Sequence, residues 1–136
     1  MREPFEIVEH TADIGFVARG ASLAELFANA ARGFMAIAAD TADVEERAEL
    51  AIEVTGEDTT SLLVNFLSEI LYLLDTGRFV PARCAVDSIQ PTVVRARLIG
   101  ESRSHAWKLI VKAVTYHEIE VSEQAGEWSA RVILDI

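Results

Sequence analysis

The feature that most constrains this chain is an apolar helical segment near its middle. The pattern predicts a helix from about Thr60 to Asp75, which Asp58 or Thr59 caps and Gly77 ends. Its apolar side chains cover more than one stripe of the helix surface: Leu62, Leu63, Phe66, Leu67, Ile70, Leu73 and Leu74. Because an apolar stripe must be buried against another element, we expect this helix to be covered on more than one side.

An earlier segment predicts a second helix with a single apolar face. Ser22 can cap it, and Glu25 three residues later completes a capping box. Apolar residues then recur at steps of three and four: Leu23, Leu26, Phe27, Ala30, Phe34, Ile37 and Ala38.

The remaining ordered segments alternate or are rich in valine and isoleucine, which predicts strands. They span residues 5–9, 14–19, 50–54, 79–89, 92–100, 109–121 and 127–135. The resulting order predicts an α+β fold with two helices packed on a mostly antiparallel sheet. Since no linker rich in proline, glycine or serine interrupts the 136 residues, we expect a single domain over residues 1–136.

Charge and cysteine content exclude several classes of function. The formal net charge of −10 repels phosphate backbones, so tight direct nucleic-acid binding is not expected. The single cysteine, Cys84, excludes an internal disulfide and favours a reducing, cytoplasmic setting, and we expect it to act as a small buried apolar residue. No apolar run approaches the roughly 20 residues that cross a bilayer, so no membrane partner is expected.

The charge is distributed unevenly along the chain. Residues 40–58 carry eight acids and one base, whereas residues 78–112 carry seven bases and two acids. Such asymmetry can define surfaces that face a partner, and the two stretches are competing candidates for a docking face. The alternative is that these are solvated strands and loops that happen to carry charge.

Two polar features interrupt or end apolar strands. His10 and Asp13 lie three residues apart in a predicted turn, where they can point to one place or form local turn hydrogen bonds. Asp135 lies one residue before the end of an apolar strand, and a buried lone carboxylate must be paired or hold a cation. With the terminal carboxylate of Ile136, these carboxylates would suit calcium, magnesium or manganese.

A third polar stretch covers residues 112–118. In one interpretation Lys112 and His117 line the same cleft as Asp13, and in the other this is an edge strand with a solvated face. The sequence contains no glycine-rich phosphate-binding loop, no paired His or Cys spacing for zinc, and no nucleophile-elbow serine.

Four stretches together resemble the archease family. They are H-T-A-D-I-G at 10–15, L-L-V-N-F-L-S-E-I-L-Y-L-L-D at 62–75, K-A-V-T-Y-H at 112–117 and V-I-L-D-I at 132–136. The resemblance implies a fold of duplicated strand-helix-strand-strand modules. It also implies a divalent cation, usually calcium, bound by Asp13, Asp135 and the terminal carboxylate of Ile136. The cleft beside them, or the contact with a partner, would involve His10, Lys112, Thr115 and His117.

The same resemblance implies a function. Archeases are small acidic, non-enzymatic cofactors of the RtcB-type tRNA-splicing RNA ligase, and they promote its guanylylation and multiple turnover. An acidic protein with this role would dock on the basic ligase and need not touch RNA. Two alternatives stay open, namely a small-molecule-binding module and a general chaperone for RNA-modifying enzymes.

Overall fold

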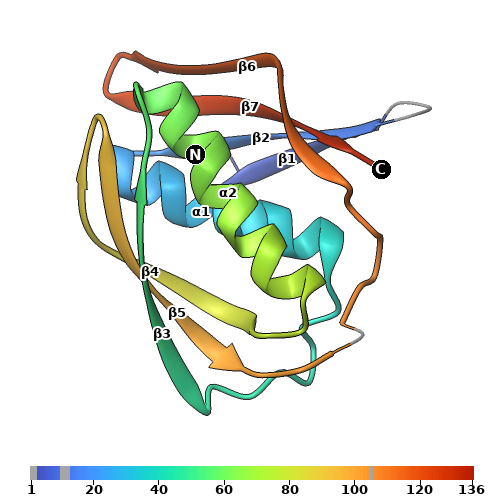
Figure 1. Ribbon diagram of the computed structural model, residues 1–136. Coiled ribbons are helices and arrows are strands. Elements are labelled where there is room, and N and C mark those ends of the chain that lie inside the picture. The colour runs from blue at the N-terminus through green and yellow to red at the C-terminus, as the bar shows by residue number, and fades with distance from the viewer. Residues whose placement is uncertain (1–2, 10–12, 105) are drawn as a thin grey trace.

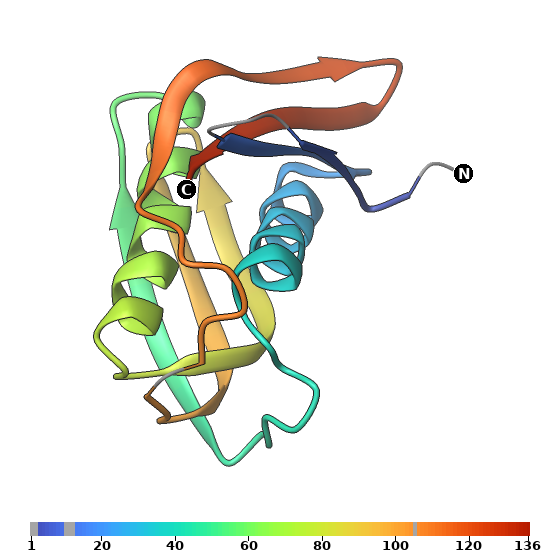
Figure 2. The ribbon, with the colours of Figure 1, turned by 90° about the vertical axis from the view of Figure 1, so that its right-hand side faces the viewer.

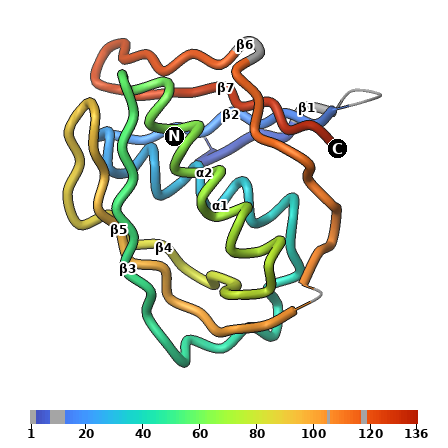
Figure 3. Tube along the Cα trace, viewed as in Figure 1, coloured from blue at the N-terminus to red at the C-terminus, as the bar shows by residue number. Residues whose placement is uncertain are grey.

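The computed structural model describes residues 3–9, 13–104 and 106–136, and within them the side chains of all but residues 8, 9, 117 and 118. Its elements follow the predicted order along the chain (Figure 3). They are β1 (Phe5–Glu9), β2 (Asp13–Gly20), α1 (Leu23–Ala38), β3 (Ala48–Thr55), α2 (Thr59–Asp75), β4 (Val80–Gln90), β5 (Val93–Glu101), β6 (Ala113–Gln124) and β7 (Glu127–Asp135).

The strands form two antiparallel sheets. The first sheet has the order β1-β2-β7-β6 and the second has the order β3-β5-β4. Both helices lie between the two sheets (Figures 1 and 2). The predicted α+β class is therefore confirmed, with the helices sandwiched between two sheets.

The sandwiched position explains the apolar surface of α2. Its buried residues are Leu62, Leu63, Val64, Phe66, Leu67, Ile70, Leu73 and Leu74. The two helices meet at Phe27 and Phe66, whose ring centroids lie 5.4 Å apart. The prediction that this helix is covered on more than one side is confirmed. Among the described residues, neither helix is long and apolar enough to span a bilayer.

The caps of the two helices are built from local side chains. Ser22 Oγ accepts a hydrogen bond from the Glu25 N–H at 3.1 Å, while the Glu25 carboxylate accepts from the Ala21 N–H at 3.2 Å. The predicted capping box at α1 therefore forms with one change: the Glu25 carboxylate bonds the N–H of Ala21, the residue before the cap, instead of the N–H of Ser22 itself. A full reciprocal box caps α2, where Asp58 accepts from the Ser61 N–H at 2.8 Å and Ser61 Oγ accepts from the Asp58 N–H at 3.0 Å.

The strand predicted over 109–121 is wrong at its beginning, because β6 begins at Ala113. The preceding segment instead bonds the end of α1: the N–H groups of Lys108 and Leu109 donate to the Ala38 carbonyl at 2.8 and 3.2 Å. This contact satisfies a carbonyl that the helix leaves without an internal partner. Residues 107–112 therefore tie the helix to the start of β6.

The connection from β2 to α1 and the connection from β3 to α2 have the same local structure. Residues with the same role lie 36 positions apart in the two connections. The pairs are Gly20 and Gly56, the caps Ser22 and Asp58, Leu26 and Leu62, and Asn29 and Asn65. In each copy the asparagine amide donates to the last carbonyl before the glycine, at 2.7 Å to Arg19 and 2.9 Å to Thr55. These bonds fix each helix to the strand that precedes it.

The strand order extends this repeat to the whole fold. The order β2-β7-β6 in the first sheet matches β3-β5-β4 in the second. We call β2, α1, β6 and β7 the first unit, and β3, α2, β4 and β5 the second unit. Each helix also packs on a strand of the other unit, α1 on β4 and α2 on β6. The duplicated architecture that the resemblance implied is therefore present, with the two units interleaved.

Candidate functional site

Two aspartates far apart in the sequence meet at one end of the first sheet. Asp13 is the first residue of β2 and Asp135 is the last residue of β7, and they lie directly opposite each other in the antiparallel ladder. Side chains of directly opposed residues extend on the same face, with Cβ atoms about 4.5–5.5 Å apart. The chain end therefore lies beside the beginning of β2, as expected, and we call Asp13 and Asp135 the acid pair.

The acid pair carries two electrostatic defects. Asp13 is half-buried, and its Oδ1 atom is buried without a hydrogen-bond partner in the part of the chain that the structure describes. A buried acceptor without a partner is unfavourable, and so are two like charges directly across a ladder. A divalent cation bound between the two carboxylates would remove both defects. The donor set fits a hard cation, which prefers oxygen ligands.

The neighbouring strand β6 fixes the chain end, and the residue that it places opposite Asp135 has no carboxylate. The Lys112 N–H donates to the Asp135 carbonyl at 2.8 Å, and Ala113 lies opposite Asp135. The Ile136 side chain packs partly buried against the core, which anchors the last residue. Within the described residues, no cluster of three or more His, Cys, Asp or Glu side chains is arranged to hold a metal ion. A cation at the acid pair would therefore need further oxygens, such as the expected carboxylate of Ile136.

The other predicted site residues lie around this position. Lys112 directly precedes β6 with an exposed side chain, and Thr115 lies opposite Ile133, the second residue before Asp135. Strand β6 is an edge strand of the first sheet, as the second interpretation of this stretch expected. His10 lies outside the described residues, as does the side chain of His117, so their proposed roles stay predictions.

The second unit provides a comparison for the acid pair, because it contains an equivalent row of residues. The matching row across β3, β5 and β4 consists of Glu49, Ile99 and Arg83. Both charges are neutralised there, since Glu49 pairs with Arg97 and Arg83 with Glu46, each at 3.0 Å. In the described structure, no ion pair neutralises either member of the acid pair. The architecture does not require two opposed carboxylates, which makes the acid pair a specific feature of the first unit.

The two charged stretches do not form separate faces of one sign. The acids of residues 40–58 pair with the bases of residues 78–112 in four ion pairs: Asp43–Arg103, Glu46–Arg83, Glu49–Arg97 and Glu53–Arg95. Exposed pairs of this kind contribute little to stability. This arrangement favours the interpretation of a solvated, internally neutralised surface over that of two docking faces.

Cys84 lies half-buried in β4 and is expected to react slowly. Burial, followed by the nearby charge of Asp87, raises the pKa of its thiol from 9.0 to about 11. The thiolate is the reactive form, so a shift of this size lowers its population at pH 8 about a hundredfold. We expect N-ethylmaleimide to alkylate Cys84 at least about a hundredfold more slowly in the folded protein than in urea, with a rate that still rises between pH 7 and pH 9.5. Equal rates in both states, followed by mass spectrometry, would contradict this environment.

Comparisons with known proteins agree on one family. The sequence matches the Archease protein family over residues 5–136. The protein named archease from Methanosarcina mazei is 37% identical over 139 residues, covering 97% of this chain and 95% of that protein. Its counterpart from Sulfolobus acidocaldarius is 32% identical over 136 residues, with 97% and 98% covered.

Solved structures agree with the fold. The solution structure of protein 1598 from Methanobacterium thermoautotrophicum has a TM-score of 0.77 and 35% identity, covering 98% of this chain and 99% of that chain. A crystal structure from Thermotoga maritima, of a protein described as an archease and possible chaperone, has a TM-score of 0.65 over 100% of this chain and 98% of that chain. At 22% identity this second likeness concerns the fold alone.

Proposed function

This chain belongs to the archease family, and from that premise we propose that it is a non-enzymatic cofactor that activates an RtcB-type tRNA-splicing RNA ligase. The observation that supports this proposal is the acid pair. It places two carboxylates opposite each other at the end of a sheet, and a buried oxygen of Asp13 has no hydrogen-bond partner among the residues that the structure describes. The proposed activity is promotion of ligase guanylylation, the step that uses GTP and a divalent metal.

In this proposal Asp13, Asp135 and the terminal carboxylate of Ile136 hold a divalent cation, with calcium the expected ion. A bound cation of this type supplies positive charge and coordination positions for oxygen ligands of a partner. Asp13 is half-buried and anchors the site, whereas Asp135 is exposed and can face the partner. The exposed Lys112 ammonium is next to this end of the sheet and can contact a phosphate or carboxylate on the ligase.

Overall charge supports docking on a protein rather than on RNA. The net charge of −10 repels phosphate backbones and attracts the basic surface that an RNA ligase needs for its own substrate. Complementary charge of this kind mainly accelerates encounter, so the proposed association should weaken as salt rises.

The test is ligase guanylylation in single turnover with labelled GTP. We expect the parent protein to accelerate the step, and Asp13→Ala and Asp135→Ala each to reduce that acceleration at least about tenfold, since each removes a carboxylate of the pair. Glu49→Ala is the matched control, because Glu49 occupies the same row in the second unit, and it should stimulate like the parent.

Two outcomes would overturn the proposal. If both aspartate variants are folded and stimulate as well as the parent, the acid pair is not the working surface. If the protein raises the soluble, folded fraction of the ligase without changing the guanylylation rate per folded molecule, it acts as a general chaperone. Circular dichroism of each variant and sedimentation of the ligase provide the two controls.

A further inference from the structure

The first sheet has a strand that the second sheet lacks. In the first sheet, β1 pairs antiparallel with β2 along the edge that β7 does not cover. The equivalent strand of the second unit is β3, which pairs only with β5 among the described strands. The chain before β3 does not fold back on it, because residues 41–44 form a turn in which the Val44 N–H donates to the Thr41 carbonyl at 3.2 Å. Strand β3 is therefore an open edge at the position that β1 covers in the first unit.

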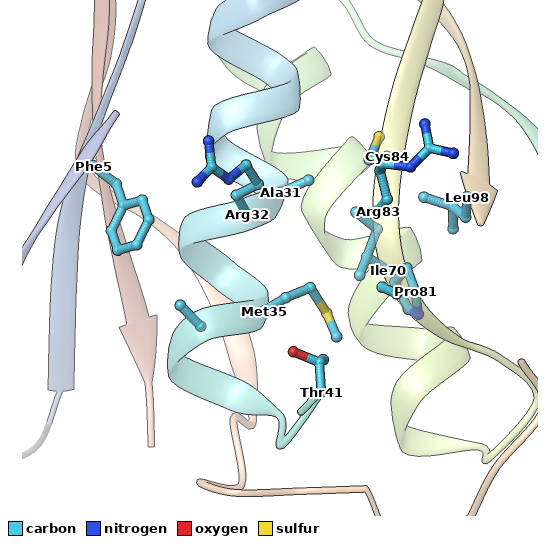
Figure 4. Close-up of a pocket in the computed structure, with 12 residues that line it drawn as sticks. Phe5, Ala31, Arg32, Met35, Thr41, Ile70, Pro81, Arg83, Cys84 and Leu98 are labelled. Carbon is cyan, nitrogen blue, oxygen red and sulfur yellow. The ribbon is translucent and has the colours of Figure 1, made fainter. Parts of the chain in front are cut away.

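Side chains at this open edge are less covered than their counterparts in the first unit. Ile14 and Phe16 of β2 are 7% and 0% exposed, whereas the matching residues of β3, Leu50 and Ile52, are half-buried. Strand β1 contributes to the burial in the first unit, because its Phe5 packs against the core on the flank of α1 (Figure 4). Leu50 and Ile52 line a groove of about 480 Å³ between β3 and α2. A strand added to β3 would cover both side chains.

The backbone of β3 is regular, unlike that of the other long edge strands. Strand β4 contains Pro81 and two register shifts, and β6 has one register shift. Strand β3 contains no proline and pairs with β5 without a shift from Ala48 to Thr55. A regular edge presents a row of unpaired N–H and C=O groups that another strand can bond. Of the long edges, β3 is thus the one best suited to accept a strand.

The first unit also indicates which backbone groups of β3 face the open edge. The Arg19 N–H of β2 donates to the Pro4 carbonyl at 2.9 Å, so the odd-numbered residues of β2 bond β1. Because the repeat spacing of 36 is even, the matching residues of β3 are also odd-numbered, and they include Ala51 and Glu53. The N–H groups of these two residues are the ones expected to bond an added strand.

The charges beside the open edge determine which strand it fits. Glu6 of β1 lies opposite Val17, whereas the equivalent of Val17 in β3 is Glu53. On the inner face, Gly33 of α1 leaves room for β1, whereas its equivalent in α2 is Glu69, which lines the groove. Opposite charges across a ladder stabilise it and like charges destabilise it. An added strand should therefore be basic at both positions, which argues against a second copy of the acidic β1 or β3.

We propose that the open edge of β3 binds an extended, basic segment of a partner protein, antiparallel to β3. Its apolar side chains would lie opposite Leu50 and Ile52, and its basic side chains would lie beside Glu53 and Glu69. Main-chain hydrogen bonds provide the affinity in this mode of recognition, and alternate side chains provide the specificity. None of these residues belongs to the acid pair, so the proposal does not depend on the proposed ligase activation.

The test is an NMR titration of the ¹⁵N-labelled protein with the peptide K-K-I-V-L, blocked at both ends. This peptide is the β1 sequence F-E-I-V-E with lysine at the two basic positions and leucine opposite Leu50. We expect it to shift the amides of Ala51 and Glu53 and to slow their hydrogen exchange. The acidic peptide E-E-I-V-L should bind at least about fivefold more weakly, since two charge contacts change from attraction to repulsion. Equal binding of the two peptides, or no shift in β3 at about 5 mM basic peptide, would overturn the proposal.

Methylated versions of the basic peptide test the main-chain hydrogen bonds. The amides at its second and fourth positions would face β3, so methyl groups on these two nitrogens should abolish binding. Methyl groups on the nitrogens at the third and fifth positions would face solvent and should leave binding unchanged. If the two methylated peptides bind equally, the segment is not added as a strand.

Two variants of the protein test the charge. Glu53→Gln should weaken binding of the basic peptide at least about threefold. Glu120→Gln is the matched control and should change nothing, because Glu120 is also an exposed acid of an edge strand that lies opposite an arginine, Arg131. An equal effect of the two variants would contradict the charge assignment. A dimer in sedimentation that shifts the same β3 amides without peptide would assign the edge to a second copy instead.

Discussion

Calcium is expected to raise the melting temperature of the chelator-treated protein by about 10 °C, and Asp13→Asn and Asp135→Asn are each expected to abolish that rise. A ligand that binds only the folded state stabilises it by about 2.7 kcal/mol at a hundred times its Kd. For a domain of this size, each kcal/mol shifts the melting temperature by roughly 4 °C. Thermal unfolding followed by circular dichroism, with EGTA and then with increasing calcium, measures the effect.

The sign of the substitution effect should reverse without the cation. In EGTA, Asp135→Asn should melt about 1–4 °C above the parent, because the repulsion between the opposed carboxylates is removed. With calcium, the same variant should melt below the parent. Glu49→Gln provides the control, since the equivalent carboxylate is already paired with Arg97 and should show no calcium dependence. A calcium shift that persists in both aspartate variants would place the cation elsewhere.

Alanine at Gly20 or Gly56 is expected to destabilise the protein by about 3 kcal/mol or more. A Cβ atom at Gly20 would lie 2.5 Å from the Leu26 nitrogen, and one at Gly56 would lie 2.6 Å from the Leu62 nitrogen. These neighbours are helix backbone, which cannot rotate away as a side chain can, so the strand and the helix must separate. Urea unfolding of the two variants measures the loss.

Gly126→Ala is the control for this prediction. Gly126 has φ of +80° and no atom within 4 Å of an added Cβ, so alanine there introduces backbone strain without a collision. The expected loss is about 1–2 kcal/mol. If the variants at Gly20 and Gly56 lose no more than Gly126→Ala, the tight contact between strand end and helix does not limit stability.

Local patterns were sufficient to predict most of this fold. Apolar periodicity located both helices, and the order of all nine elements follows from alternation and turn residues. The acid pair could be anticipated only in part: Asp135 does end an apolar strand, but its side chain is exposed, and the half-buried carboxylate is that of Asp13. The position of Asp135 opposite Asp13 depended on the family resemblance, since strand pairing between residues 122 positions apart leaves no local signal.

Other features depend on contacts that the sequence does not display. The late start of β6 results from hydrogen bonds between residues 108–109 and Ala38, about 70 positions earlier. The repeat was detectable in principle, because Gly20, Asn29 and their counterparts recur at a constant spacing, but most other positions have diverged.

The packing of each helix on strands of both units has a consequence for how such a protein acquires new roles. Neither copy is complete by itself, because each needs the partner copy to cover its helix, and the arrangement corresponds to an intertwined dimer joined into one polypeptide. The two subunits of a homodimer must have the same sequence, whereas two copies fused into one chain can differ. One copy can then keep the neutral, ion-paired scaffold, while the other is free to specialise in unbalanced charge.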